Sequence, residues 1–455
     1  MAVDETVTEE RPSVILREAI ESKNAKQAEA VIEGLSASDG ARAVLQLEQD
    51  EQIGLIELVD AETAARIVEH LPDETAAVLV EEQDAEDAAE ILEELDSDDQ
   101  ADVLGEMDDE DAAAILSQMD RKDSETVQRL MSFDDETAGG LMMVEVFKFA
   151  ESETVGAVLG RLSDPEDDLE RYRRQHPYIV TDSGRLSGVV SLRSLLTSPR
   201  AATLSTIMSP AMAVGPDAAL AKLRDIFDDH PFLGLPVVDE DGILIGVVSR
   251  DALAEAELEH AEADVQKVQG VVNEELRSMP TLLRARRRLS WLTINIGLNI
   301  IAVSIIALYE ETLAAVIALA VFLPIVSDMS GCSGNQAVAV SLRELSLGVV
   351  RPSDLLRVWL KEAAVGVING FALGVLIALA AWIWKGNPFL GLVVGIALAV
   401  NTIVAVSIGG TVPLALKRFD IDPAVASGPM LTTITDMFGF FLLLGLATLM
   451  LPLLI

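Results

Sequence analysis

The stretch FLPIVSDMSGCSGNQAVAV, from Phe322 to Val340, begins as an apolar helix and then places an acid, Asp328, among small and polar residues. It lies within a run from Thr312 to Leu342 in which Asp328 is the only charged side chain. A carboxylate in the middle of a lipid-spanning helix costs about 2.5–3.5 kcal/mol on insertion scales, so such an acid usually faces a cavity or a partner. The stretch therefore predicts a membrane helix whose acid faces a cavity or a partner.

Four further apolar runs accompany it, at residues 289–309, 363–384, 386–416 and 423–455, and only the last contains a charge, Asp436. Each is long enough to cross a hydrocarbon core, which needs about 20 helical residues. Buried helices of a large soluble protein would need a polar outer layer that these runs lack. We therefore expect an all-α transmembrane domain of five helices at residues 289–455. The five runs contain no Lys, Arg or His, so neither acid has a cationic partner within them.

The short loops predict the orientation of these helices. Ten basic residues lie before the first run, between the second and third, and between the fourth and fifth, whereas Lys385 is the only basic residue in the opposite loops. Cytoplasmic loops carry the excess of Lys and Arg. Residues 1–11 also show no secretory signal. We expect a cytoplasmic N-terminus and, after five spans, a C-terminus outside.

Residues 1–140 contain a twelve-residue repeat, seen in DAETAARIVEHL (60–71) and DAEDAAEILEEL (84–95). Most units open with a capping residue, carry an acid about three places later and close on apolar residues, a pattern typical of short helices joined by tight turns. Stacked units predict an α-superhelix. With 41 acidic and 9 basic side chains, the segment should repel nucleic acid. Its acids either stabilise helix starts or form a sensor that divalent cations bridge.

Two α/β units follow, at residues 141–200 and 201–254. HPYIVTDSGRLSGVVSLRSLL (176–196) and GLPVVDEDGILIGVVSRDAL (234–253) align at a constant offset, and each predicts two strands and a helix. The two units resemble tandem CBS domains, in which an Asp three places after a Ser or Thr holds a nucleotide ribose. Ser194 and Ala252 occupy those places, so tight nucleotide binding is doubtful, although Asp251 lies one place early.

Residues 255–288 form a predicted connecting helix that is acidic at first and basic where it meets the first span. It either transmits a movement or is a passive linker, but a flexible tether would contain more Gly and Ser. Acids in or beside this helix are candidate regulatory cation ligands: Asp228, Asp229, Glu255, Glu259, Glu262 and Asp264.

The donor set indicates the kind of ion. The only cysteine is Cys332, and all four histidines precede the apolar half. Oxygen donors alone suit hard cations such as Mg²⁺, Ca²⁺ or Mn²⁺. Asn335 and Gln336 offer amide oxygens, and we expect the small residues around them to let backbone carbonyls line a wet cavity. Glycines there are alternatively close-packing positions between helices.

The order of parts over nearly the whole chain is similar to the MgtE family of magnesium channels and transporters. LPIVSDMSGCSGNQ (323–336) is similar to the glycine-rich signature of that family, and DPAVASGPMLTTITDMFG (422–439) is similar to its last span. The resemblance implies a pore aspartate at Asp436 and signature residues at Gly331, Gly334 and Gln336, with Asn335 at a variable place. It also implies a homodimer with the path on its two-fold axis. Ser330, Cys332 and Asp328 depart from the signature.

The expected function is Mg²⁺ influx across the plasma membrane, gated by cytosolic Mg²⁺ that binds the repeat and the CBS units. The alternatives are a CBS-regulated channel or carrier for Co²⁺, Mn²⁺ or Ca²⁺, or a magnesium sensor that does not transport. An enzyme is not expected, because the spans lack the His-Glu-x-x-His of an intramembrane metalloprotease. The sequence leaves channel and carrier equally open.

Overall fold

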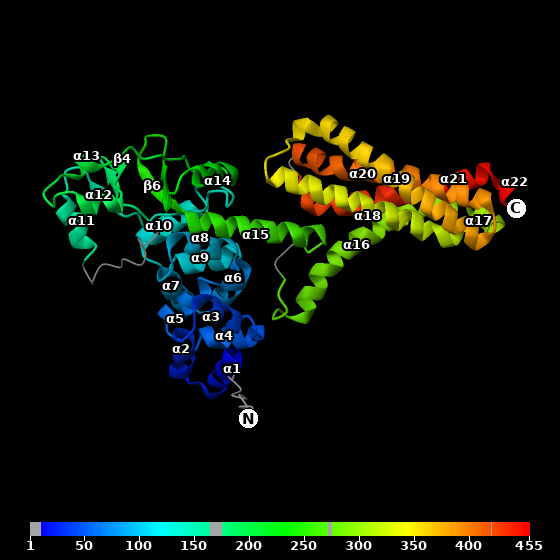
Figure 1. Cartoon of the computed structure of the whole chain (residues 1–455). Helices are drawn as coiled ribbons and strands as arrows, with labels where there is room; N and C mark the ends of the chain where they lie inside the picture. Colours follow the sequence, from blue (N-terminus) through cyan, green and yellow to red (C-terminus); the bar gives the residue numbers. More distant parts are fainter. Residues whose placement is uncertain (1–10, 164–174, 272–274, 420) are drawn as a thin grey trace, which may run out of the picture. The chain divides into compact units, whose positions relative to one another are not determined.

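The computed structural model describes residues 11–163, 175–271, 275–419 and 421–455 (Figure 1). The chain divides into two compact units, one formed by residues 1–259 with 276–280 and the other by residues 260–275 with 281–455. The first unit holds the repeat and both α/β modules, and the second holds the long apolar helices.

The twelve-residue repeat forms short helices that stack into one superhelix. These helices are α1 (Pro12–Ser22), α2 (Ala25–Glu33), α3 (Ala37–Val44), α4 (Gln49–Ile56), α5 (Ala61–Val68), α6 (Asp73–Glu81), α7 (Ala85–Glu93), α8 (Ser97–Gly105), α9 (Asp109–Leu116) and α10 (Arg121–Leu130). The predicted caps are confirmed at Ser36 and Asp60, whose side chains accept hydrogen bonds from the third residue on. The apolar stripe of each helix packs on its neighbours, and this core continues into the second α/β module.

The two α/β modules form two three-stranded sheets. The first sheet contains β2 (Lys148–Ala150), β3 (Tyr178–Val180) and β4 (Leu186–Val189), and the second contains β1 (Met142–Met143), β5 (Gly234–Val238) and β6 (Leu244–Ser249). Helices α11 (Val155–Arg161), α12 (Leu192–Thr197), α13 (Leu204–Ile207) and α14 (Leu220–Asp229) accompany them.

The predicted tandem relation between the modules is visible in their hairpin turns. Gly184 and Gly242 occupy equivalent turns, and both have positive φ, at 81° and 78°, which glycine adopts without strain. Leu186 N–H donates to the Gly242 carbonyl at 3.0 Å, and Leu244 N–H donates to the Gly184 carbonyl at 3.1 Å. These reciprocal bonds join the modules in a symmetric pair.

The connecting segment is not one helix, as the sequence had suggested. Helix α15 (Arg250–Val268) is followed by Gly270 in a left-handed conformation with φ 82°, and the next helix, α16 (Thr281–Ala307), begins after Pro280. A left-handed glycine ends a helix readily, and proline favours an extended residue before it. Residues 272–274 lie outside the described residues.

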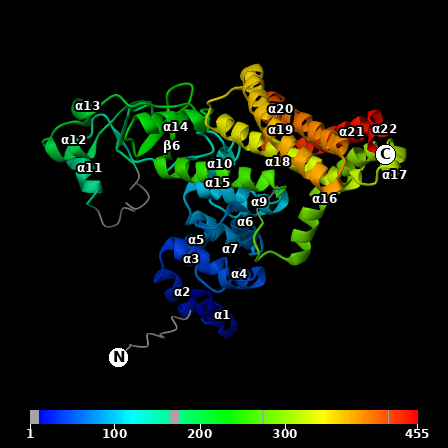
Figure 2. The same ribbon diagram turned by 45° about the vertical axis from the view of Figure 1, so that its right-hand side comes forward.

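The second unit is built from long helices that run alongside one another (Figures 1 and 2). They are α16, α17 (Glu310–Ala315), α18 (Leu319–Ser346), α19 (Leu355–Lys385), α20 (Pro388–Arg418) and α21 (Pro423–Leu449), with a short η1 (Pro352–Asp354) before α19 and α22 (Leu451–Leu454) at the end. Helix α20 packs against α18, α19 and α21, and α16 packs on α21.

Of the five predicted spans, four are long and apolar enough to cross a membrane among the described residues: Thr281–Ala307, Pro352–Lys385, Pro388–Arg418 and Pro423–Leu449. The run at 312–342 instead forms α17 and α18. Its mixture of Ser, Asp, Asn and Gln lowers its hydropathy, which is why it is not among the four. The expectation of small residues freeing backbone carbonyls is also wrong, because α18 continues as a helix through the whole stretch.

Candidate metal sites

Asp436 lies on α21 and faces α18, where Ser327 donates a hydrogen bond to its Oδ1 atom. The side chain is partly buried. Asp328, the residue after Ser327, lies near enough to interact electrostatically with it. Neither acid forms a salt bridge among the parts of the chain that the structure describes. Two neighbouring carboxylates without a cationic side chain make a site that favours a cation.

The other predicted residues of α18 divide between two faces. Asp328, Asn335 and Gln336 are exposed, and Gly334 is buried. A Cβ atom at Gly334 would lie 2.8 Å from Leu431 Cδ2 and 3.0 Å from the Ala405 carbonyl oxygen. Gly334 therefore lets α18 pack closely on α20 and α21, which is the alternative that the sequence left open for glycines.

Gly331 faces Thr435 more loosely, since a Cβ atom there would lie 3.9 Å from the Thr435 hydroxyl. The sequence did not single out Ser327 or Asn401. Both hydrogen-bond across helices beside Asp436. A polar side chain inside an apolar run was the available signal, but the partner of such a side chain depends on helix register.

The six predicted regulatory acids are not gathered at one place. Asp228 and Asp229 are exposed at the end of α14, and no divalent site forms around them among the described residues. Glu262 is exposed on α15, and Asp264 lies 3.9 Å from His260 on the same helix.

Glu255 and Glu259, by contrast, belong to a cluster that the sequence did not reveal. Glu255 interacts electrostatically with Asp73 of α6, and Glu259 interacts with Asp102 of α8. Asp102 also interacts with Asp73 and Asp98. We call Asp73, Asp98, Asp102, Glu255 and Glu259 the acid cluster. It brings carboxylates of the superhelix to the start of α15, although Asp98 is joined to Glu255 and Glu259 only through its neighbours.

The acid cluster is electrostatically unfavourable without a cation. Burial, together with the neighbouring Asp73 and Asp98, raises the pKa of Asp102 to about 8. Burial and Asp96 raise the pKa of Asp98 to about 7, and its Oδ1 has no hydrogen-bond partner among the described residues. Burial, with Glu106 and Glu255, raises the pKa of Asp73 to about 6. A divalent ion would neutralise this repulsion with the oxygen donors it prefers.

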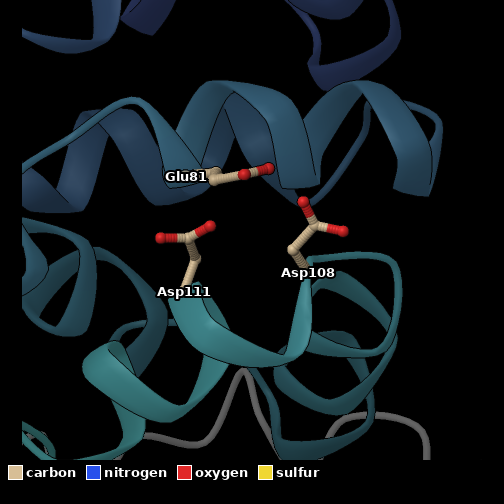
Figure 3. A group of neighbouring side chains, drawn as sticks. All are labelled: Glu81, Asp108 and Asp111. Atoms are coloured by element: carbon tan, nitrogen blue, oxygen red, sulfur yellow. The ribbon is translucent and has the colours of Figure 1, made fainter.

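A second group of acids lies elsewhere on the superhelix. Glu81 of α6 lies beside Asp108, the N-cap of α9, and Asp111 of α9, with one carboxylate oxygen of each within 4.8 Å of the others (Figure 3). Burial raises the pKa of Glu81, and a hydrogen bond with Asp111 adds to this shift. Because acidic groups often gather at a protein surface without an ion, we assign no ligand to these three residues.

Three family models match: a divalent cation transporter domain, MgtE, at residues 323–446, an MgtE intracellular N domain at 35–136, and a CBS domain at 204–259. The chain is 33% identical over 329 residues to magnesium transporter MgtE of Thermus thermophilus, covering 71% of this chain and 72% of that protein. It is 30% identical over 328 residues to magnesium transporter MgtE of Bacillus subtilis, with the same coverage.

A solved structure is also similar. It is the cytosolic domain of the Mg²⁺ channel MgtE in complex with ATP, with 29% identity and a TM-score of 0.48, and the match covers 54% of this chain and 99% of that one. The family matches cover the superhelix from residue 35, the second CBS unit and the apolar helices from α18 to α21. The chain belongs to the MgtE family of magnesium transporters.

Proposed function

We propose that this chain lets Mg²⁺ enter the cell across the plasma membrane, along a path that passes Asp436. The observation that carries the proposal is the placement of Asp436 and Asp328 together on α21 and α18 without a cationic side chain. The relatives from Thermus thermophilus and Bacillus subtilis described above are named as magnesium transporters. An inside-negative potential favours entry of a divalent ion by about 4.6 kcal/mol per 100 mV, at about 2.3 kcal/mol per charge.

The proposal includes α18 as a fifth span. With 28 residues it is about 42 Å long, which exceeds a hydrocarbon core of about 30 Å. A membrane-spanning helix tolerates these polar residues if they face a water-filled path. Five spans with the basic loops inside give a cytoplasmic N-terminus and an outside C-terminus.

We also propose that two chains share the path. In a single chain Asp328, Asn335 and Gln336 are exposed on α18. All three lie within the apolar run at residues 312–342. A second copy against this face would enclose these polar side chains and bring a second Asp436 near the first. Mg²⁺ keeps most of its water and binds through one or two carboxylates, which such a pair would supply.

Gating would use the acid cluster. When cytosolic Mg²⁺ is plentiful, an ion bridging Asp73 or Asp102 to Glu255 or Glu259 would hold the start of α15 against the superhelix. When Mg²⁺ is scarce, repulsion among the same acids would release α15, whose residues 260–268 belong to the second unit. The ion shifts the equilibrium because it binds only the closed arrangement tightly. Asp228, Asp229, Glu262 and Asp264 stay as weaker candidates for this role.

Nucleotide binding by the two CBS units is a separate part of the proposal. The similar cytosolic domain is a complex with ATP, which runs against the doubt raised by the sequence. In this chain Ser191 Oγ and Ser194 Oγ are bonded to each other at 2.9 Å, and Ser249 Oγ accepts a bond from Ala252 N–H at 2.9 Å. Neither place supplies a carboxylate, so we propose weak nucleotide binding.

The decisive test is ion uptake into proteoliposomes that contain a magnesium-sensitive dye. Asp436→Ala should reduce Mg²⁺ uptake at least tenfold, whereas Glu310→Gln, at an exposed acid of α17, should transport like the wild type. Equal flux in Asp436→Ala and wild type would remove Asp436 from the path. Competition by Co²⁺, Mn²⁺ and Ca²⁺ would identify a different cargo, and cation-dependent protease protection without flux would identify a sensor.

A further inference from the structure

Asn401 is an amide in the most enclosed helix of the membrane unit. In α20, 61% of the apolar window is buried, against 33% or less in the other three candidate spans. Asn401 lies near the middle of α20 and has no exposed surface. A buried amide costs several kcal/mol unless hydrogen bonds replace its water. Its position therefore requires partners on the neighbouring helices.

The carboxamide nitrogen of Asn401 finds these partners on two different helices. It donates to the Ser330 hydroxyl of α18 at 2.5 Å and to the Thr435 carbonyl of α21 at 3.0 Å, and it lies 3.5 Å from the Val326 carbonyl of α18. Acceptors on every side identify this end of the amide as the nitrogen. Gly439 makes room for it, since a Cβ atom there would lie 2.8 Å from the nitrogen.

These contacts lie directly behind the Ser327–Asp436 hydrogen bond. Val326 and Thr435, whose carbonyls surround the Asn401 nitrogen, are the residues immediately before Ser327 and Asp436. Ser330 extends the arrangement, because its hydroxyl donates to the Val326 carbonyl and lies 3.1 Å from the Ser327 carbonyl. The buried Asn401 side chain thus holds the backbone of α18 next to Ser327 and the backbone of α21 next to Asp436.

We propose that Asn401, together with Ser330, is a positioning element that sets which ion the path accepts. By holding α18 and α21 at one spacing, it lets the Ser327 hydroxyl orient the Asp436 carboxylate. Mg²⁺ demands near-ideal octahedral geometry, whereas Ca²⁺ tolerates irregular and larger shells, so a displaced carboxylate should harm Mg²⁺ passage more than Ca²⁺ passage. This inference rests on the proposed path through Asp436.

The Asn401 oxygen contributes differently. Oδ1 has no hydrogen-bond partner among the described residues, so a substitution that removes it loses no bond. Asn401→Leu keeps the branching at Cγ, with two methyl groups in place of the amide nitrogen and oxygen, and removes the donating nitrogen from the network. Thr402→Val is the matched control, because Thr402 is equally buried on α20 but its hydroxyl bonds to Leu398 of the same helix at 2.8 Å.

The test measures Mg²⁺ and Ca²⁺ uptake by full-length protein in proteoliposomes, over a range of concentrations. Asn401→Leu should lower maximal Mg²⁺ flux roughly tenfold, the scale seen when outer-shell partners of a metal site are removed. The Mg²⁺/Ca²⁺ flux ratio should fall by at least threefold, a change that lower protein yield alone does not produce. Thr402→Val should leave both within twofold.

A Mg²⁺/Ca²⁺ ratio in Asn401→Leu equal to that of Thr402→Val would overturn the inference. If Asn401→Leu does not assemble, Ser330→Ala replaces it as the smaller change, and an unaltered ratio there overturns the inference as well. Asp436→Ala is run alongside. Wild-type flux in Asp436→Ala refutes the path itself, whereas lost flux in Asp436→Ala with an unaltered ratio in Asn401→Leu refutes only the role of Asn401.

Discussion

Replacing Asp102 by Asn is a direct test of the acid cluster. The Asp102 side chain on α8 interacts electrostatically with four acids, and all of these charges disfavour its ionised form. They are Asp73 of α6, Asp98 of α8 itself, Asp135 in the segment after α10, and Glu259 of α15. Asn has nearly the same shape and no charge. The substitution therefore removes repulsion without opening a cavity.

The expected change in the free energy of unfolding follows from the raised pKa of Asp102. Burial and the neighbouring acids raise the pKa of Asp102 from 3.8 to about 8. The folded protein then holds a proton that the unfolded chain has released, so the contribution of Asp102 to stability is greatest below about pH 4 and falls as pH rises toward 8. At about 1.36 kcal/mol per pKa unit the upper limit is about 6 kcal/mol. Since the other acids remain, we expect about half of this, near 2–3 kcal/mol at pH 8.

Pulse proteolysis of the full-length protein in detergent, over a urea series, measures this stability for the superhelix. With a urea dependence of about 1–3 kcal/mol per molar, Asp102→Asn should raise the midpoint by about 1 M at pH 8 and by much less at pH 5. Asp109→Asn is the control, because Asp109 is exposed on α9. Its midpoint should shift little at either pH.

Magnesium supplies the second half of the test. An ion at 100 times its dissociation constant stabilises by about 2.7 kcal/mol. At pH 8, Mg²⁺ should therefore raise the midpoint of the wild type by about 1 M and that of Asp102→Asn by clearly less. A lower midpoint for Asp102→Asn at pH 8, or an equal gain from Mg²⁺ in both proteins, would refute the reasoning.

Two further predictions concern helix packing and the CBS pair. Gly370→Ala should lower the melting temperature of the detergent-solubilised protein, because its Cβ atom would lie 2.5 Å from the Ala399 carbonyl oxygen and overpacking costs about 1–3 kcal/mol. Gly297→Ala, with nothing within 4 Å, should leave that temperature unchanged or higher. Ser194→Asp should strengthen ATP binding about tenfold by calorimetry, since a hydrogen bond to a charged group contributes about 1.5–3 kcal/mol; unchanged affinity would contradict the proposed ribose contact.

Local patterns of the sequence predicted the elements well. The twelve-residue spacing of acids and apolar pairs corresponds to helices α3 to α10, because caps and apolar stripes act within one turn of the chain. The constant offset between the CBS units is confirmed by the equivalent glycine turns at Gly184 and Gly242. The same local reasoning failed at the connecting segment, where Gly270 and Pro280 interrupt what composition alone suggested was one helix.

The sites were harder to predict, because they depend on register between distant segments. The repeat supplies many acids that look alike in sequence, and stacking of the helices decides that Asp98 and Asp102 become half-buried while Asp109 stays exposed. Asp436 was predicted as a site residue because a charge in an apolar run is conspicuous. Asn401 was not singled out, since one amide in such a run does not reveal which helices its nitrogen reaches.

The acid cluster and the Asp436–Asp328 pair use carboxylates for different physical purposes. In the acid cluster the carboxylates face one another across separate helices, so the energy of the arrangement changes steeply with protonation or with a bound cation. Such a site suits a switch. Beside Asp436, the Asn401 amide and the Ser327 hydroxyl fix the backbone and the carboxylate, so little of the geometry is left for an ion to change. A fixed carboxylate suits selection among ions, because only a cation whose hydration shell fits the imposed spacing keeps its full stabilisation.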